Sequence, residues 1–227
     1  MLFRSGDAED ENASQGFAFG GEGDDIIVGE ARISADGGEG NDAISLRVGG
    51  FANGGAGNDS LTAFDDATLE GGAGDDDILM LAGGSVDGGT GKDDITATFY
   101  STVSGGKDND LVRMNSGGIY RFAKGDGVDN VLMGSTQTGK FTDWGKTNRI
   151  ELSGFNRADV DVLVSPTEIR IISRDPKIKD QVNLTRSLAG DTVELVFTND
   201  NKTQTMTIGR NGETLSALVP VINPQIA

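Results

Sequence analysis

The sequence predicts an all-β fold, a parallel β-solenoid of 17-residue coils followed by a small β-rich C-terminal unit. Three observations predict it: a glycine-rich motif that returns at a fixed interval, two apolar positions that stay in phase with it, and a change of composition near residue 130. A fixed short period is the signature of a solenoid, in which each repeat forms one coil and neighbouring coils share a core.

The repeated motif is clearest in GGAGNDSLT, residues 54–62. Its copies begin at Gly20, Gly37, Gly54, Gly71, Gly88 and Gly105, so the interval is constant and no copy slips out of phase. A degenerate seventh copy begins at Lys124, slightly later than this interval predicts, and the sixth carries Asp108 where the third glycine belongs. Aspartate tolerates the left-handed region better than most residues, so this turn is expected to persist.

Two positions of the coil, counted from its first glycine, are apolar in all six regular repeats. Position 8 is Ile27, Ile44, Leu61, Ile78, Ile95 and Val112, and position 16 is Ala35, Ala52, Leu69, Val86, Val103 and Tyr120. Their neighbours are mostly polar, which is the alternation of a half-buried strand. We therefore expect strands at positions 7–10 and 15–17, a turn at positions 1–6, a looser bend at 11–14, and a core one side chain deep from each strand.

Net charge and glycine content both change near residue 130. Residues 1–130 hold 25 acidic and eight basic residues and 28 of the 35 glycines, whereas residues 131–227 hold equal numbers of acidic and basic residues. An acidic surface argues against a nucleic-acid partner, because phosphates are repelled. The chain has no cysteine, so disulfides and thiolate metal sites are excluded, and neither an 18-residue apolar run nor an N-terminal secretory signal is found.

Composition and the extent of the repeats predict how the chain is divided. We expect a lead-in at 1–19, the roll at 20–132, a polar connector at 133–148 and the C-terminal unit at 149–227. Within that unit, alternating apolar residues predict strands, and residues 212–219 are a helix candidate. The predicted strands span residues 149–152, 160–164, 168–172, 181–185, 193–197 and 205–208.

The turn repeats an aspartate at position 6, so stacking makes a column of carboxylates. Its members are Asp25, Asp42, Asp59, Asp76, Asp93, Asp110 and, from the seventh copy, Asp129. Unit charges about 4.8 Å apart repel by roughly 0.9 kcal/mol even at the dielectric constant of water, so cations are expected between them. Calcium fits best, because it takes six to eight oxygen ligands in flexible geometry, whereas magnesium demands a stricter octahedron and zinc or copper prefers His or Cys.

The glycines of the turn are expected to supply backbone carbonyl ligands, because a residue without Cβ lets neighbouring coils approach closely. These are Gly20, Gly21, Gly23, Gly37, Gly38, Gly40, Gly54, Gly55, Gly57, Gly71, Gly72, Gly74, Gly88, Gly89, Gly91, Gly105 and Gly106.

The motif GGxGxDxUx, with U a large aliphatic residue, resembles the nonapeptide of RTX (repeats-in-toxin) proteins, the haemolysin-type calcium-binding repeat. The resemblance is tight over residues 20–113, extends to about 132, and is looser for the segment from Ile119 onward, which resembles the calcium-binding-related domain that follows such arrays. It implies a right-handed parallel β-roll with calcium between successive turns, export by type I secretion machinery with an uncleaved C-terminal signal, and an extracellular or cell-surface location. This chain departs from the family in having one nonapeptide per coil, so calcium should line one edge only.

The expected function is calcium-coupled folding of a structural and secretion module, with any catalytic domain upstream of the repeats. The region itself is not expected to be an enzyme: it has no histidine, GxSxG elbow or phosphate loop, and its in-phase acids, which could otherwise serve a glycosidase, are assigned to the turns. The alternative is a polysaccharide-binding or adhesin spacer module. An ice-binding surface fails, because position 9 forms no threonine row.

Overall fold

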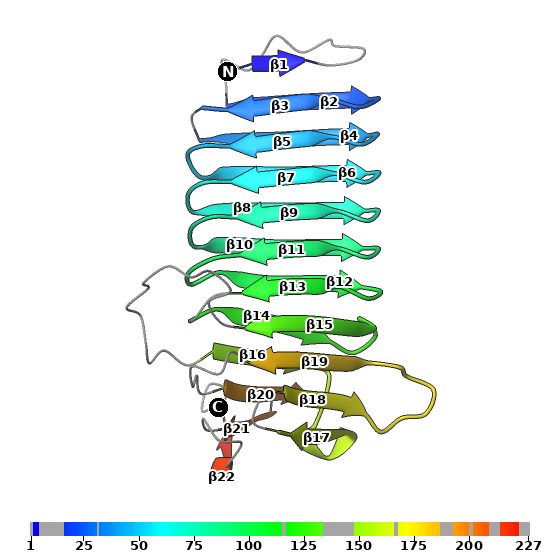
Figure 1. Ribbon diagram of the computed structural model, residues 1–227, viewed down its shortest axis with the longest axis vertical. Coiled ribbons are helices and arrows are strands. Elements are labelled where there is room, and N and C mark those ends of the chain that lie inside the picture. The colour runs from blue at the N-terminus through cyan, green and yellow to red at the C-terminus, as the bar shows by residue number, and fades with distance from the viewer. Residues whose placement is uncertain are drawn as a thin grey trace.

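The computed structural model describes residues 2–4, 16–30, 32–114, 117–133, 148–165, 168–186, 193–199, 202–208 and 214–222. These residues form two 11-stranded sheets, and the strands of each sheet are stacked along the long axis of the molecule like the rungs of a ladder (Figure 1). They contain no α-helix and one short 3-10 helix, η2 (Arg157–Asp159). The predicted connector, and most of the lead-in, lies outside the described residues.

The first sheet collects the strands that follow each glycine-rich turn. In spatial order it consists of β1 (Leu2–Arg4), β3 (Ile26–Gly29), β5 (Ala43–Leu46), β7 (Ser60–Ala63), β9 (Asp77–Met80), β11 (Asp94–Ala97), β13 (Leu111–Met114), β15 (Val128–Met133), β19 (Gln181–Arg186), β18 (Glu168–Ser173) and β17 (Val160–Val164).

The second sheet collects the strands that lead into the turns. In spatial order it consists of β2 (Phe17–Glu22), β4 (Ile33–Glu39), β6 (Gly50–Ala56), β8 (Ala67–Ala73), β10 (Gly84–Thr90), β12 (Thr102–Lys107), β14 (Ile119–Ala123), β16 (Asn148–Ser153), β20 (Val193–Asn199), β21 (Lys202–Ile208) and β22 (Thr214–Ile222).

Strand pairing confirms the 17-residue coil. Leu61 pairs with Ile44 on one side and Ile78 on the other, and all pairings between β2 and β14 and between β3 and β15 are parallel. The seventh copy joins the stack, because Val131 pairs with Val112 in spite of its longer spacing. The chain therefore forms the parallel β-solenoid that the sequence predicts, with about seven turns.

The core contains both predicted apolar columns and is thicker than predicted. Every residue at positions 8 and 16 of the six regular coils is at most 2 % exposed. Position 10 is buried as well, and its members include Leu46, Met80 and Met114. Strands of the first sheet thus place two side chains inside the coil, because four extended residues put two side chains on each face.

The turn is shorter than predicted. Positions 1–3, which the sequence assigns to the turn, end the second-sheet strand instead, as in β6, which runs to Ala56. Only positions 4–6 connect the sheets, as Gly57–Asp59 do before β7 begins at Ser60. The second glycine of the pair has a positive φ, which glycine adopts without strain, so the strand pairing continues through it, as from Gly55 to Gly72.

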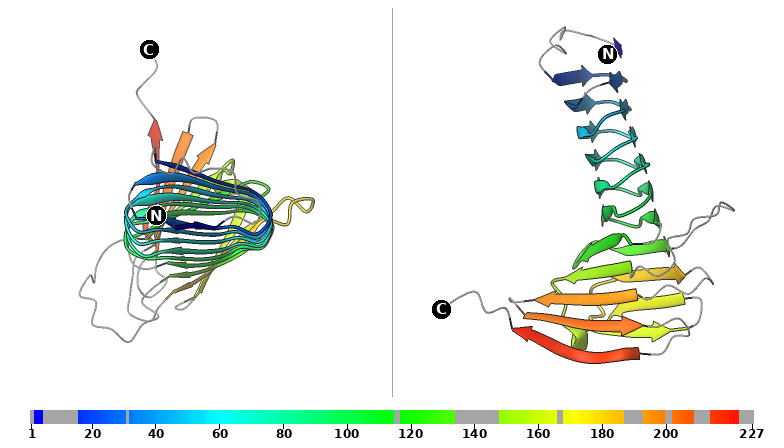
Figure 2. Two further views of the ribbon diagram at one scale, coloured as in Figure 1. Left: turned by 90° about the horizontal axis from the view of Figure 1, so that it is seen from above. Right: turned by 90° about the vertical axis from the view of Figure 1, so that its left-hand side faces the viewer.

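The parallel stack continues into the C-terminal unit. β16 pairs in parallel with β14, β19 with β15, and β20 with β16; antiparallel strands follow only after these. Larger side chains widen the core there, and the rings of Phe122 and Phe155 stack at 6.0 Å. Figure 2 shows the slender roll and the broader C-terminal strands. The boundary between roll and C-terminal unit stays a prediction.

The helix prediction for residues 212–219 is wrong. The described part of this segment, residues 214–219, belongs to β22, which pairs antiparallel with β21, with Thr203 opposite Val221. Residues 217–222 are a short continuous apolar run, whose period does not distinguish a strand from a helix. Pro220 is tolerated because β22 is an edge strand.

Candidate functional site: a column of buried aspartates

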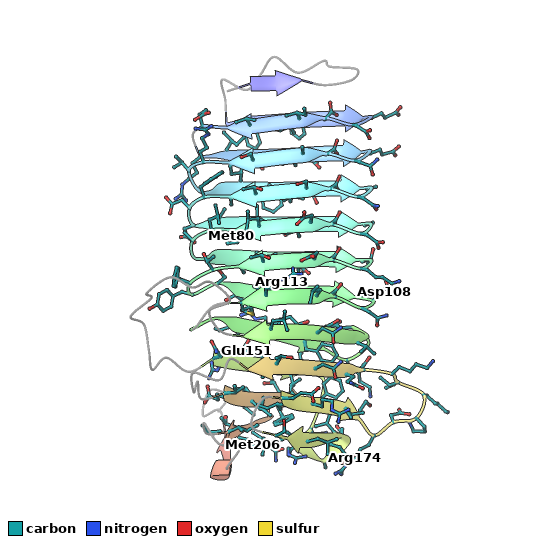
Figure 3. The ribbon with its side chains drawn as sticks, in the orientation of Figure 1. Met80, Asp108, Arg113, Glu151, Arg174 and Met206 are labelled. Atoms are coloured by element: carbon teal, nitrogen blue, oxygen red, sulfur yellow. The ribbon has the colours of Figure 1, made fainter. Side chains whose placement is uncertain are left out.

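The column of aspartates lies along the edge where the glycine-rich turns join the two sheets, the edge on which Figure 3 labels Asp108. The structure brings together all seven predicted members. Each side chain is at most 2 % exposed, although it lies on a surface turn. The members are Asp25, Asp42, Asp59, Asp76, Asp93, Asp110 and Asp129.

One oxygen of each carboxylate forms a ladder along the stack. The backbone N–H of Asp42 donates to Oδ1 of Asp59 at 2.7 Å, and that of Asp59 donates to Oδ1 of Asp76 at 2.8 Å. The same bond recurs from Asp25 through Asp110 at 2.7–3.1 Å. Each aspartate therefore holds the turn of the preceding coil in register.

The other oxygen has no protein partner over most of the column. Oδ2 is buried and makes no hydrogen bond to any described residue in Asp42, Asp59, Asp76, Asp93 and Asp110. A buried carboxylate oxygen without a partner is costly, so a polar column of this kind calls for a ligand.

Glycine makes room for this carboxylate. A Cβ built on Gly54 would lie 2.3 Å from Oδ2 of Asp59 and 2.4 Å from the carbonyl oxygen of Gly71, both closer than real contacts allow. The same pair of oxygens, from the aspartate of one coil and the glycine of the next, surrounds position 1 from Gly20 to Gly88. Carboxylate and carbonyl oxygens thus converge between adjacent coils.

The second and third glycines serve a different purpose. Gly55 and Gly57 have φ of 109° and 130°, in the range that favours glycine. Their carbonyl oxygens lie against the corresponding glycines of the next coil, Gly72 and Gly74. The residue between them, at position 3 of the coil, accepts a hydrogen bond from the preceding coil: the carbonyl oxygen of Ala56 accepts from Gly40 N–H at 2.8 Å. In the sixth coil Asp108 replaces the third glycine of the motif. Its φ is 85°, in a region that aspartate tolerates better than most residues.

Burial raises the pKa of the column. It raises the pKa of Asp42 and of Asp93 to about 6, of Asp76 to about 7 and of Asp110 to about 8, against an ordinary value of 3.8. The hydrogen bond from the preceding turn opposes this rise, and repulsion by nearby carboxylates adds to it. Protons or cations are therefore needed to neutralise the column at neutral pH.

The donor set fits a hard cation. It consists of carboxylate and carbonyl oxygens, which suit calcium and magnesium and not zinc or copper. Among the described residues no three His, Cys, Asp or Glu side chains gather into one cluster, so a cation here would depend on one or two carboxylates together with glycine carbonyls.

Asp129 differs from the other six. Its Oδ1 accepts from Asp110 N–H at 3.1 Å, and its Oδ2 accepts from the hydroxyl of Tyr120. Both oxygens therefore have protein partners, and the Tyr120 hydroxyl contacts the Oδ2 position that has no hydrogen-bond partner in the five aspartates from Asp42 to Asp110. Sequence reasoning placed Tyr120 in the apolar column; its hydroxyl, unique in that column, was the available signal.

Replacing Tyr120 by Phe is expected to lower the free energy of unfolding by about 1–3 kcal/mol, because it leaves a buried carboxylate oxygen without its donor. Urea denaturation in calcium measures the loss. Tyr100→Phe is the matched control, since Tyr100 is 49 % exposed and an exposed substitution changes stability by about 0.5 kcal/mol or less. Equal midpoints for the two variants would contradict the capping role.

A second ladder on the turn, at position 5, was missed by sequence reasoning. The N–H of Asn58 donates to Oδ1 of Asn41 at 2.8 Å, and the N–H of Asp75 donates to Oδ1 of Asn58 at 2.9 Å. It runs opposite to the first ladder, since here each coil donates to the one before it. Asp24 and Asp75 also belong to this exposed ladder.

Comparison of the chain with models of known protein families and with curated proteins gives no match. No helix among the described residues is long and apolar enough to cross a membrane.

Proposed function

We propose that this chain is the calcium-binding roll of an exported protein of the RTX type, and that calcium completes its fold. The observation that carries the proposal is the run of buried Oδ2 atoms without hydrogen-bond partners, repeated in register with glycine carbonyls. The 17-residue solenoid and the GGxGxD turns are compatible with such a roll.

The residues that would hold the ions are the column aspartates from Asp25 to Asp110, with carbonyl oxygens of the turn glycines. Calcium would supply the positive charge that neutralises the column and links one coil to the next. Because the site exists only when coils are stacked, binding free energy becomes folding free energy. Asp129 is the least suited member, since both its oxygens are occupied.

Such coupling accounts for export. In a low-calcium cytosol the carboxylates repel one another, which keeps the roll from folding and suits passage through type I secretion machinery. Outside the cell calcium drives folding. The extracellular location, the C-terminal secretion signal and the absence of catalysis in this region belong to the same proposal.

Far-UV circular dichroism and thermal unfolding of the full chain test the proposal. In chelator at pH 7.5 the β signal of the roll is expected to be largely lost, and millimolar calcium is expected to restore it, with magnesium at the same concentration restoring much less. Binding at 100 times the dissociation constant adds about 2.7 kcal/mol per independent site. An unchanged spectrum and melting temperature in chelator would refute calcium-coupled folding.

The alternative, a polysaccharide-binding spacer, is favoured by a different feature of the structure, a polar groove on the outer face of the second sheet. The two functions are compatible, because the groove and the aspartate column involve different side chains.

A further inference from the structure

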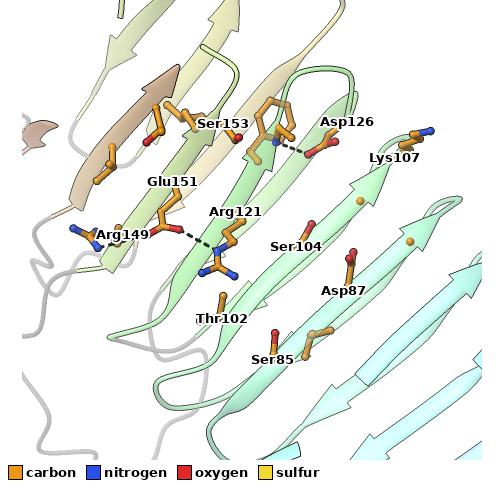
Figure 4. A pocket seen from close by; sticks show the side chains of 18 of the residues that line it. Ser85, Asp87, Thr102, Ser104, Lys107, Arg121, Asp126, Arg149, Glu151 and Ser153 are labelled. Atoms are coloured by element: carbon orange, nitrogen blue, oxygen red, sulfur yellow. Dashed lines mark hydrogen bonds and ion pairs between the residues drawn. The ribbon is translucent and has the colours of Figure 1, made fainter. Parts of the chain in front are cut away.

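A shallow groove of about 860 Å³ crosses the outer face of the second sheet where the roll meets the C-terminal strands (Figure 4). Its lining comes from six neighbouring strands, β10, β12, β14, β16, β20 and β21. At about 4.8 Å per strand, the groove is about 24 Å long and is oriented across the strands. That length suits a segment of a polymer better than a single small molecule.

The lining is rich in hydroxyl groups and paired charges. Serine and threonine recur on successive strands, and Arg121 Nε pairs among them with Glu151 Oε2 at 3.0 Å. Arg149, which also lines the groove, pairs through Nε with Oε2 of Glu194, outside the lining, at 2.9 Å. The arginine side chains are 57 % and 41 % exposed, and Arg149 Nη1 also donates to Glu151 Oε1 at 3.5 Å. The hydroxyl-bearing residues are Ser85, Thr90, Thr102, Ser104, Ser153, Thr198 and Thr203.

The groove is balanced in charge although the chain carries −17. It is lined by three basic residues, Lys107, Arg121 and Arg149, and by three acidic residues, Asp87, Asp126 and Glu151. A polyanion would gain little from this lining and would be repelled by the rest of the chain. The groove therefore favours an uncharged polar ligand.

A second hollow, of about 390 Å³, shares Ser85 with the groove and extends it toward the looser bend. It is lined by Arg32, Asp66 and Tyr100. Tyr100 is 49 % exposed and has φ of 58°, a conformation uncommon for a bulky residue. It adds an exposed aromatic ring to one end of the groove.

This hollow forms because large residues and glycine alternate at position 13 of successive coils. Arg32, Asp66 and Tyr100 occupy position 13 of the first, third and fifth coils, and glycine occupies it in the second, fourth and sixth. Side chains at this position therefore recur every second coil, about 9.6 Å apart, with gaps between them.

We propose that this face binds a neutral polysaccharide, lying across the strands from Tyr100 to Thr198. Hydroxyl groups and planar Arg–Glu pairs donate and accept hydrogen bonds as adjacent sugar hydroxyls require, and an aromatic ring packs against the C–H face of a sugar. An extended peptide is disfavoured, because peptides pair with sheet edges and the face of a sheet offers no free backbone groups.

Affinity electrophoresis of the full chain in calcium tests the proposal, with glucomannan, xylan, laminarin and dextran as neutral probes and polygalacturonate as the anionic probe. We expect retardation by at least one neutral glycan and not by polygalacturonate. Arg121→Ala and Tyr100→Ala are each expected to weaken binding about tenfold, the equivalent of about 1.4 kcal/mol.

Arg47→Ala is the matched control. Arg47 forms an ion pair of similar length, 3.2 Å to Glu30, and lies outside both hollows. Circular dichroism of each variant in calcium verifies the fold, so failure of glycan binding is distinguished from failure of calcium-coupled folding. Three results would overturn the proposal: no neutral glycan retards the folded chain, only polygalacturonate retards it, or the Arg121→Ala variant binds as well as the unchanged protein.

Discussion

Without calcium, the protein is expected to be most stable near pH 4 and to lose stability steadily up to about pH 8. Asp42, Asp76, Asp93 and Asp110 have folded-state pKa values of about 6 to 8 against 3.8 when unfolded. A raised pKa means that the folded state holds protons that the unfolded state has released. Its stabilisation is complete below pH 3.8 and disappears as the pH rises through the folded-state pKa values.

Several groups act together, so the loss between pH 4 and pH 8 is expected to be on the order of several kcal/mol. Urea denaturation in chelator measures it from pH 4 up to the pH at which the metal-free roll no longer folds, and the loss of the β signal marks that pH. Asp76→Asn should reduce the slope, because the amide keeps an oxygen for the ladder bond from Asp59 N–H and has no proton to lose. It should also weaken calcium binding, so this substitution stabilises the metal-free protein at pH 8 and destabilises the calcium-loaded one.

Calcium is expected to reverse the pH dependence, because protons and cations compete for the same carboxylates. The increase in melting temperature on adding calcium should therefore be largest near pH 8 and small near pH 4. A metal-free protein that gains stability between pH 4 and pH 8 would show that the column is not neutralised by protons.

The periodic part of the fold could be predicted from the sequence because each coil repeats the same local constraints. The apolar residues at positions 8 and 16 fix the register, since a slip of one residue would expose a whole column. The seventh copy was found despite its irregular spacing, because Asp129 and Val131 keep their relative positions and pair with the sixth coil.

The details of the site depend on contacts between coils that one repeat does not specify. The motif indicates that an aspartate is needed at position 6. It does not indicate that Oδ1 accepts from the preceding coil while Oδ2 is left for a ligand, because both oxygens are chemically alike until the stack forms. The same limit concealed the bond from Tyr120 to Asp129, which depends on how the sixth and seventh turns stack. It also concealed the parallel pairing of β16 with β14 and of β20 with β16, which joins segments far apart in sequence.

Replacing Gly71 by Ala is expected to destabilise the roll strongly. The new Cβ would lie 2.3 Å from Oδ2 of Asp76 and 2.4 Å from the carbonyl oxygen of Gly88. The first of these atoms belongs to a carboxylate held in the hydrogen-bonded ladder, and the second belongs to the backbone. Neither can move away without disrupting the stacking of the coils. A loss of about 3 kcal/mol or more is expected in calcium, at the upper end of overpacking in well-packed interiors, together with weaker calcium binding.

Gly83→Ala is the matched control, because it adds the same methyl group to the opposite bend. There the nearest atom to the new Cβ is the carbonyl oxygen of Phe99 at 3.5 Å, an ordinary contact, and the backbone lies outside the left-handed region. Its stability should change by less than about 1 kcal/mol. Gly71 also lies outside that region, so the difference between the two variants measures space and not backbone strain. Equal urea midpoints would mean that the first glycine is not required for the close approach of Asp76 to the next coil. The argument that glycine shapes the calcium site would then fail.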